Sequence, residues 1–141
     1  MLGFLEFSAL FVGLNIVSDI VHLKLRSIHG IDFLFFAPWL AASLYGMYEG
    51  IILALILVVV HALFNLHLAV YELASFPAQL VAVFLGNTMG LVSFWISLIA
   101  FLAVSSVIVI LLRGFGGRFF IFLLIALVFN YILIFTIPYL T

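Results

Sequence analysis

The sequence predicts an all-α, polytopic integral membrane protein, a bundle of about six transmembrane helices. Of its 141 residues, 70% are hydrophobic and only 6% are charged, and the mean hydropathy of +1.58 is far above that of a soluble domain. Apolar runs long enough to cross a hydrocarbon core of about 30 Å recur along the chain. Because the polar segments between them are short, we expect a single transmembrane domain over residues 1–141, located in the cell membrane.

Short polar segments separate the predicted helices. The clearest are KLRSIHGID at 24–32, YELASFP at 71–77 and RGFGGR at 113–118. Residues 33–48 form a shorter run than the ~20 residues of a straight span, which predicts a short, tilted helix or a re-entrant one. The six predicted helices cover residues 4–24, 33–48, 50–70, 76–91, 93–112 and 119–138.

Two of these boundaries lie inside apolar stretches that are too long for one span. Glu49 and Gly50 divide the stretch 33–70. In the stretch 76–112, the segment GNTMG at 86–90 is expected to be the turn between two helices, or else a helix break that lines a cavity.

The basic residues support this division. Lys24 and Arg26 lie in the first predicted loop, and Arg113 and Arg118 lie in the fifth. With six spans the two loops share one side of the membrane, which the positive-inside rule makes cytoplasmic. Both termini are then outside. A single helix over 76–112 would place two basic residues on each side.

The composition also excludes several functional classes. The chain has no cysteine, which rules out disulfides, thiolate metal sites and iron–sulfur clusters. With four basic residues and a net charge of −1, it has no basic patch for nucleic acid. The sequence contains no Ser–His–Asp order of catalytic residues, no phosphate-binding loop and no HExxH motif, so we expect neither an enzyme nor a cofactor.

Ionisable residues inside membrane helices are the first candidates for function, because burying them unpaired is costly. The first predicted helix carries Asn15, Asp19 and His22 on one face. One interpretation is an Asp–His pair that handles protons or cations, or half of a metal site. The alternative is an interfacial cap whose carboxylate reaches Lys24 or water.

The third predicted helix carries His61 and Asn65 four residues apart on one face. We interpret them as a mid-membrane pair that must face protein, whereas His67 lies on another face and nearer the interface. The candidate partners of His61 are Asp19 and His22 if the first and third helices pack together, or else Asn87 or a neighbouring subunit. Because a transition-metal site needs three or four converging ligands, and the two histidines are not spaced for a local chelate, we predict no metal.

Small residues recur at a spacing of four in two helices. Ala9 and Gly13 lie in the first, and Ala42, Gly46 and Gly50 run from the second helix across its junction with the third. This spacing allows close helix approach, either within the bundle or with a partner protein.

The segments ALFVGLN and FFAPWLAASLYGMYEGIILALILVVVHAL resemble the pattern of S components, the small membrane-embedded substrate-binding subunits of energy-coupling-factor transporters. Rod-shape membrane proteins of the MreD type share a similar pattern. The resemblance implies six helices, a small-molecule substrate and energy supplied by partner subunits. It also implies a coupling face on the first helix, where Ala9 and Gly13 stand in place of an Ala-x-x-x-Ala motif.

The sequence therefore predicts a membrane-embedded, small-molecule-binding transporter subunit, surrounded by the lipid bilayer and associated with other membrane subunits. The alternative is a non-catalytic structural subunit of a larger membrane complex. In the first case a polar cavity is lined by substrate-binding residues on three helices: Asn15, Asp19, His61, Asn65 and Asn87.

The six-span topology predicts that the first and fifth loops lie on the same side of the membrane. Single cysteines introduced at Ser27 and at Gly116 in this cysteine-free chain should therefore react with a membrane-impermeant maleimide from the same side. Labelling from opposite sides would contradict the six-span count.

Overall fold

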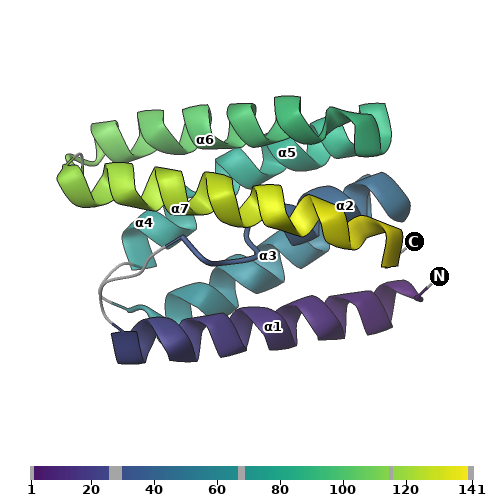
Figure 1. The fold of residues 1–141 in the computed structure, drawn as a ribbon, viewed down its shortest axis with the longest axis horizontal. Helices are drawn as coiled ribbons and strands as arrows, with labels where there is room; N and C mark the ends of the chain where they lie inside the picture. Colours follow the sequence, from purple (N-terminus) through teal and green to yellow (C-terminus); the bar gives the residue numbers. More distant parts are fainter. Residues whose placement is uncertain (1, 26–29, 67–68, 115, 140–141) are drawn as a thin grey trace.

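The computed structural model describes residues 2–25, 30–66, 69–114 and 116–139, and all regular secondary structure in these ranges is helical (Figure 1). The all-α prediction is confirmed. Two 3₁₀ segments, Gly90–Ser93 and Ile134–Tyr139, accompany the α-helices. The α-helices are α1 (Phe4–Leu25), α2 (Phe36–Leu44), α3 (Met47–Phe64), α4 (Ala69–Ala74), α5 (Phe76–Met89), α6 (Phe94–Leu111) and α7 (Gly117–Leu133).

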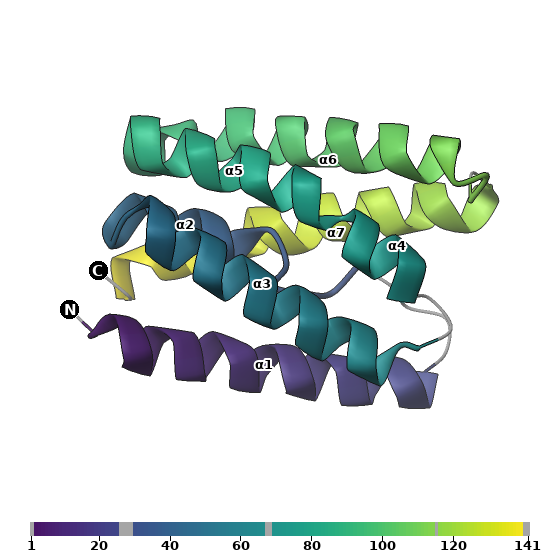
Figure 2. The same ribbon diagram turned by 180° about the vertical axis from the view of Figure 1, so that it is seen from behind.

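Four helical stretches of the described chain are long and apolar enough to cross a membrane: Phe4–Lys24, Met47–Phe64, Ala69–Leu111 and Phe119–Pro138. They support the prediction of a membrane protein. The third stretch has 43 residues, but it is not straight, because α5 and α6 run in opposite directions (Figures 1 and 2). Gly90, with φ of +63°, caps α5 and reverses the chain. The turn predicted at 86–90 thus lies at the last residue of that segment.

The predicted helix 33–48 is shorter in the structure, because residues 30–35 are not helical. Two side chains accept the backbone N–H groups at its start: Asn15 Oδ1 binds the N–H of Phe33 at 3.2 Å, and Asp32 Oδ1 binds the N–H of Leu34 at 3.1 Å. Pro38 lies in the first turn of α2, where a missing N–H is tolerated. The helix in this region is thus short, at nine residues.

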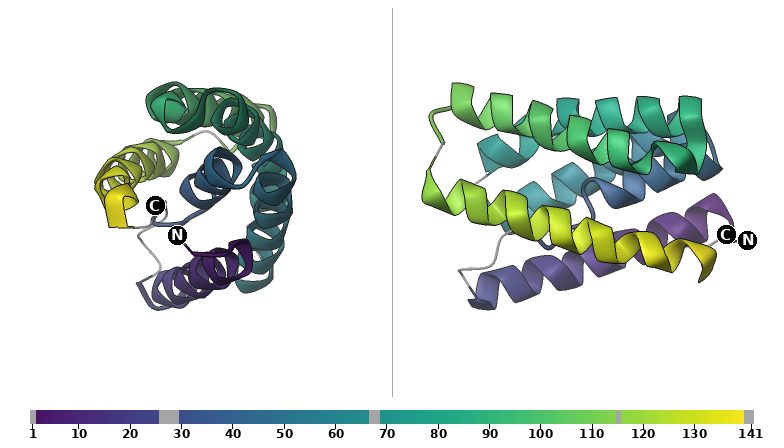
Figure 3. Two further views of the ribbon diagram at one scale, coloured as in Figure 1. Left: turned by 90° about the vertical axis from the view of Figure 1, so that its right-hand side faces the viewer. Right: turned by 45° about the horizontal axis from the view of Figure 1, so that its top comes forward.

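The other helices surround α2, as the end-on view in Figure 3 shows. It packs mainly on α3 and α5, and every residue from Phe36 to Ala42 is buried. The indole N–H of Trp39 donates to Ser93 Oγ at 3.0 Å, and the ring of Trp39 packs edge-on against Phe94. The core of the molecule is therefore built around α2.

The two ends of the molecule differ in the elements that meet there. Both termini lie at one end, together with the α2–α3 and α5–α6 turns, whereas α1, α3 and α6 finish at the opposite end (Figures 1 and 2). Lys24 lies in the last turn of α1, and Arg113 directly follows α6. These two basic residues therefore share an end, as the six-span topology expects. Arg26 and Ser27 lie outside the described residues.

Small residues hold α2 close to α3 and α5. A Cβ atom added to Gly50 would lie 2.7 Å from Ala42 Cβ and 3.1 Å from Val83 Cγ1. Ala42 and Gly50 are buried, so they pack within the chain, which was one of the two alternatives for this spacing. Gly46 has φ of +126° and forms the α2–α3 turn.

The first helix uses its small residues differently. Ala9 and Gly13 lie on the exposed face of α1, and a Cβ atom added to Gly13 would meet nothing within 4 Å. These two residues are therefore accessible to a partner protein, as the partner-interface prediction requires, whereas Ala42 and Gly50 are covered by their own chain.

Gly50→Ala should lower the free energy of unfolding by about 1–3 kcal/mol, because the added methyl group overpacks the α2–α3 contact. Gly13→Ala, the matched control on α1, should leave it unchanged or raise it by up to about 1 kcal/mol, because alanine favours the helix and space is open. Thermal unfolding of both variants in the same detergent measures the difference. Equal losses would show that the α2–α3 contact is looser than described.

Candidate functional site

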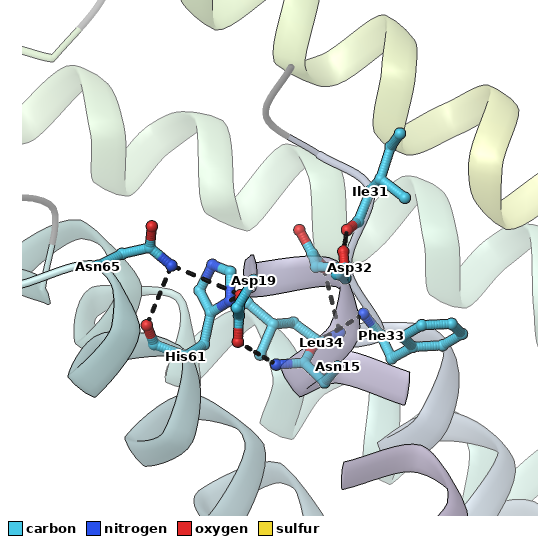
Figure 4. A network of polar contacts seen from close by, with 9 residues as sticks. Asn15, Asp19, Ile31, Asp32, Phe33, Leu34, His61 and Asn65 are labelled. Atoms are coloured by element: carbon cyan, nitrogen blue, oxygen red, sulfur yellow. Dashed lines mark hydrogen bonds and ion pairs between the residues drawn. The ribbon is translucent and has the colours of Figure 1, made fainter. Parts of the chain in front are cut away.

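Buried polar side chains gather where α1, α3 and the non-helical segment 30–35 meet (Figure 4). The predicted residues Asn15 and Asp19 come from α1, and His61 comes from α3 with Asn65 directly after it. Asn15 and Asp19 have an exposed fraction of 0%, and His61 and Asn65 of 4% and 3%. The structure thus brings together four of the five residues predicted to line a site. We call these four residues the polar cluster.

The carboxylate of Asp19 is the centre of the polar cluster. His61 Nδ1 makes a close ion-pair contact with Asp19 Oδ1. Asn15 Nδ2 donates to Asp19 Oδ2 at 3.0 Å, and Asn65 Nδ2 lies 3.5 Å from Asp19 Oδ1. Of the candidate partners for His61, Asp19 is therefore the one observed. The alternative in which Asp19 reaches Lys24 or water is wrong, because the carboxylate is enclosed by side chains from two helices.

The polar cluster also satisfies the backbone of segment 30–35. Asn15 Oδ1 accepts the N–H of Phe33 at 3.2 Å, and Ser18 Oγ donates to the carbonyl oxygen of Ile31. Backbone groups outside a helix are tolerated at membrane depth only where protein or a water-filled cavity satisfies them. Asn15 thus links two groups. Its side-chain N–H₂ group donates to Asp19, and its side-chain carbonyl oxygen accepts the N–H of Phe33.

The position of the pair along its helix differs from the prediction. The helix predicted over 50–70 ends at Phe64, so His61 lies in its last turn and Asn65 is its C-cap. The side-chain amide of Asn65 donates to the carbonyl oxygen of His61 at 3.2 Å, which satisfies one of the last carbonyls of the helix. His61 and Asn65 therefore lie at the end of a helix and not in its middle. Both side chains do face protein, as expected.

His22 lies one turn of α1 beyond Asp19 and is 5% exposed. Its ring meets the ring of His61 edge to face, with 6.3 Å between the ring centroids. His22, His61 and Asp19 therefore follow one another in space. Within the described ranges, no group of three or more His, Asp or Glu side chains is arranged to hold a metal ion.

Asn87 does not belong to the polar cluster. It is exposed in the last turn of α5, and none of the hydrogen bonds recorded for the described residues links it to the other four. The neighbouring Gly86 is buried against Trp39, so the next residue, about 100° further around the helix, points away from the core. The prediction that Asn87 lines the site is wrong for this reason. His67 lies outside the described residues.

Ser18 is a residue of this region that the sequence analysis missed. It is 8% exposed and holds the non-helical backbone at Ile31. Its position three residues after Asn15 places it beside the polar face of α1. That spacing was a usable signal, but serine is common in membrane helices and is not ionisable, so the signal was weak.

Comparisons of the chain with protein-family models, with curated proteins and with solved structures find no match.

Removing His61 from the buried Asp19–His61 pair should destabilise the fold by about 3 kcal/mol, because the Asp19 carboxylate stays buried without this partner. His61→Phe alone should show this loss in detergent unfolding. The double variant Asp19→Leu with His61→Phe should be closer to the wild-type chain, because no carboxylate then remains buried without a partner. Additive losses in this double-mutant cycle would show that the two side chains are not coupled.

Proposed function

We propose that the chain is a membrane-embedded subunit of a transporter and that it binds a small polar molecule at the polar cluster, in the manner of the S components that its sequence resembles. The observation that carries the proposal is the buried Asp19–His61 pair beside the non-helical segment 30–35. Ionisable residues inside membrane segments are costly and mark solute or ion pathways. Broken helices beside such residues are typical of transporter binding sites.

The chemistry of the polar cluster favours a small molecule with both donors and acceptors. Asp19 offers a carboxylate, His61 an imidazole, and Asn15 and Asn65 two amides. In the structure these groups bind one another, so a ligand must replace internal contacts. Because α1 packs chiefly on α3, a displacement of α1 from α3 would expose all four side chains at once.

The proposed topology has six crossings of the membrane. In addition to α1, α3, α6 and α7, it counts α5 with α4 as one crossing and α2 with segment 30–35 as another. The antiparallel course of α5 and α6 supports this count, as does the position of both termini at one end (Figures 1 and 2). The end that carries Lys24 and Arg113 is then cytoplasmic. Because the sequence has no phosphate-binding loop, partner subunits would supply energy.

A non-catalytic structural subunit is the second candidate. It is favoured by the mutual hydrogen bonding of the polar cluster, which in that case would only fasten α1 to α3. The exposed small residues Ala9 and Gly13 would then lie against another membrane protein.

Native mass spectrometry of the full chain in mild detergent separates the two candidates. A transporter subunit should carry a bound small molecule, and Asn65→Ala should weaken the affinity for it by about fivefold, because one good hydrogen bond contributes on the order of 1 kcal/mol. Asn87→Ala is the matched control, since Asn87 is exposed, and should retain the molecule. Stoichiometric protein partners without any small molecule would favour the structural subunit and contradict the proposal.

A further inference from the structure

We infer that His22, His61 and Asp19 form a proton-transfer chain and that Asp19 is its proton acceptor, which rests on the proposed function because it concerns that same site. The chain links the carboxylate of Asp19 to the end of the molecule that carries Lys24 and Arg113. The observations that support it are the order of the three groups, their burial and the set of donors around Asp19.

The three groups are neighbours in space. His61 Nδ1 contacts Asp19 Oδ1, and the rings of His22 and His61 meet edge to face at 6.3 Å between centroids. All three side chains are at least nine-tenths buried. His22 lies in the last turn of α1, about 5 Å along the axis from its final residue. His22 and His61, which lies in the last turn of α3, are therefore both close to this end of the bundle.

The surroundings of Asp19 favour a proton over a metal cation. The contacts recorded for its two oxygens come from nitrogen donors on Asn15, Asn65 and His61. A cation such as Na⁺ would need to displace these donors and to collect several oxygen ligands. A proton needs neither space nor new ligands, because it can move along the existing contact from His61 Nδ1 to Asp19 Oδ1.

The transfer involves only N–H and O–H bonds. A proton taken up from water by the imidazole of His22 passes to Nε2 of His61, while the proton on Nδ1 of His61 moves to Oδ1 of Asp19. His22 returns to its neutral form, and His61 stays neutral with its proton on the other nitrogen. Asp19 changes from a carboxylate to a carboxylic acid, so one negative charge is neutralised inside the bundle.

Among the described residues of the elements around α3, few other side chains titrate. Segment 30–35 contributes Asp32, whose carboxylate binds the N–H of Leu34. The helices α2 and α5, which also pack on α3, carry no Asp, Glu, His, Lys or Arg. Helix α4 carries Glu72 and Tyr71, and the ring of Tyr71 lies against Gly114.

Protonation of Asp19 can be measured directly in the full chain reconstituted in phosphatidylcholine vesicles. After a pH jump, time-resolved infrared spectroscopy follows the C=O stretch of a protonated carboxyl group. The sequence contains only two aspartates, Asp19 and Asp32. In an Asp32→Asn background, ¹³C-labelled aspartate therefore identifies the Asp19 signal even if Asp19→Asn does not fold.

We expect an isotope-sensitive band that appears on acidification and is absent in Asp19→Asn. His22→Phe, which keeps an aromatic ring against His61, should slow the appearance of the band by about 100-fold without reducing its final amplitude. A purely structural role for His22 would not produce this division between rate and amplitude. Glu49→Gln, at the start of α3 and remote from the chain, should leave the band and its rate unchanged.

The proton chain is overturned if no Asp19 band appears while the protein stays folded, or if His22→Phe protonates at the wild-type rate. These failures are distinct from failure of the proposed function. A bound small molecule without protonation of Asp19 would retain the transporter subunit and remove the proton. Protonation of Asp19 through His22 in a protein that binds no small molecule would retain the proton chain and remove the transporter subunit.

Discussion

The structure depends on one constraint, which is that polar groups within the hydrocarbon must find their partners inside the chain. Polar side chains on one face of α1 supply most of these partners. Asp19 on that face holds His61 and Asn65 at the end of α3, and Asn15 and Ser18 hold the non-helical backbone before α2. The first helix therefore fastens two elements that would otherwise expose a charge or unpaired peptide groups to lipid.

The short α2 helix follows from the same constraint. A run of nine residues is too short to cross a bilayer alone, so it must be enclosed by other helices. Gly50 and Gly86 allow this enclosure, because any side chain at either position would collide with the backbone or side chains of α2. The hydrogen bonds that hold segment 30–35 and the close packing around α2 thus act together to enclose α2.

The sequence was sufficient for those features that depend on composition and local spacing. Hydropathy predicted the helical membrane fold, and four-residue spacing placed Asn15 with Asp19 and His61 with Asn65. Features that depend on tertiary contacts were not predictable in this way. Helix α3 ends at Phe64 in an apolar run with no proline or glycine to mark it, and the face of α5 that is buried is set by the contact of Gly86 with Trp39. Asn87 was therefore assigned to the wrong face.

Asn15 connects the carboxylate of Asp19 to the backbone of segment 30–35. Its amide group donates to Asp19 Oδ2 at 3.0 Å, while its carbonyl oxygen accepts the N–H of Phe33 at 3.2 Å. A hydrogen bond to a charged carboxylate is roughly twice as strong as one to a neutral acceptor. Neutralising Asp19 therefore weakens the hold on the Asn15 amide, and with it the geometry that binds Phe33. The charge of a single buried carboxylate is in this way linked to the position of the segment that leads into α2.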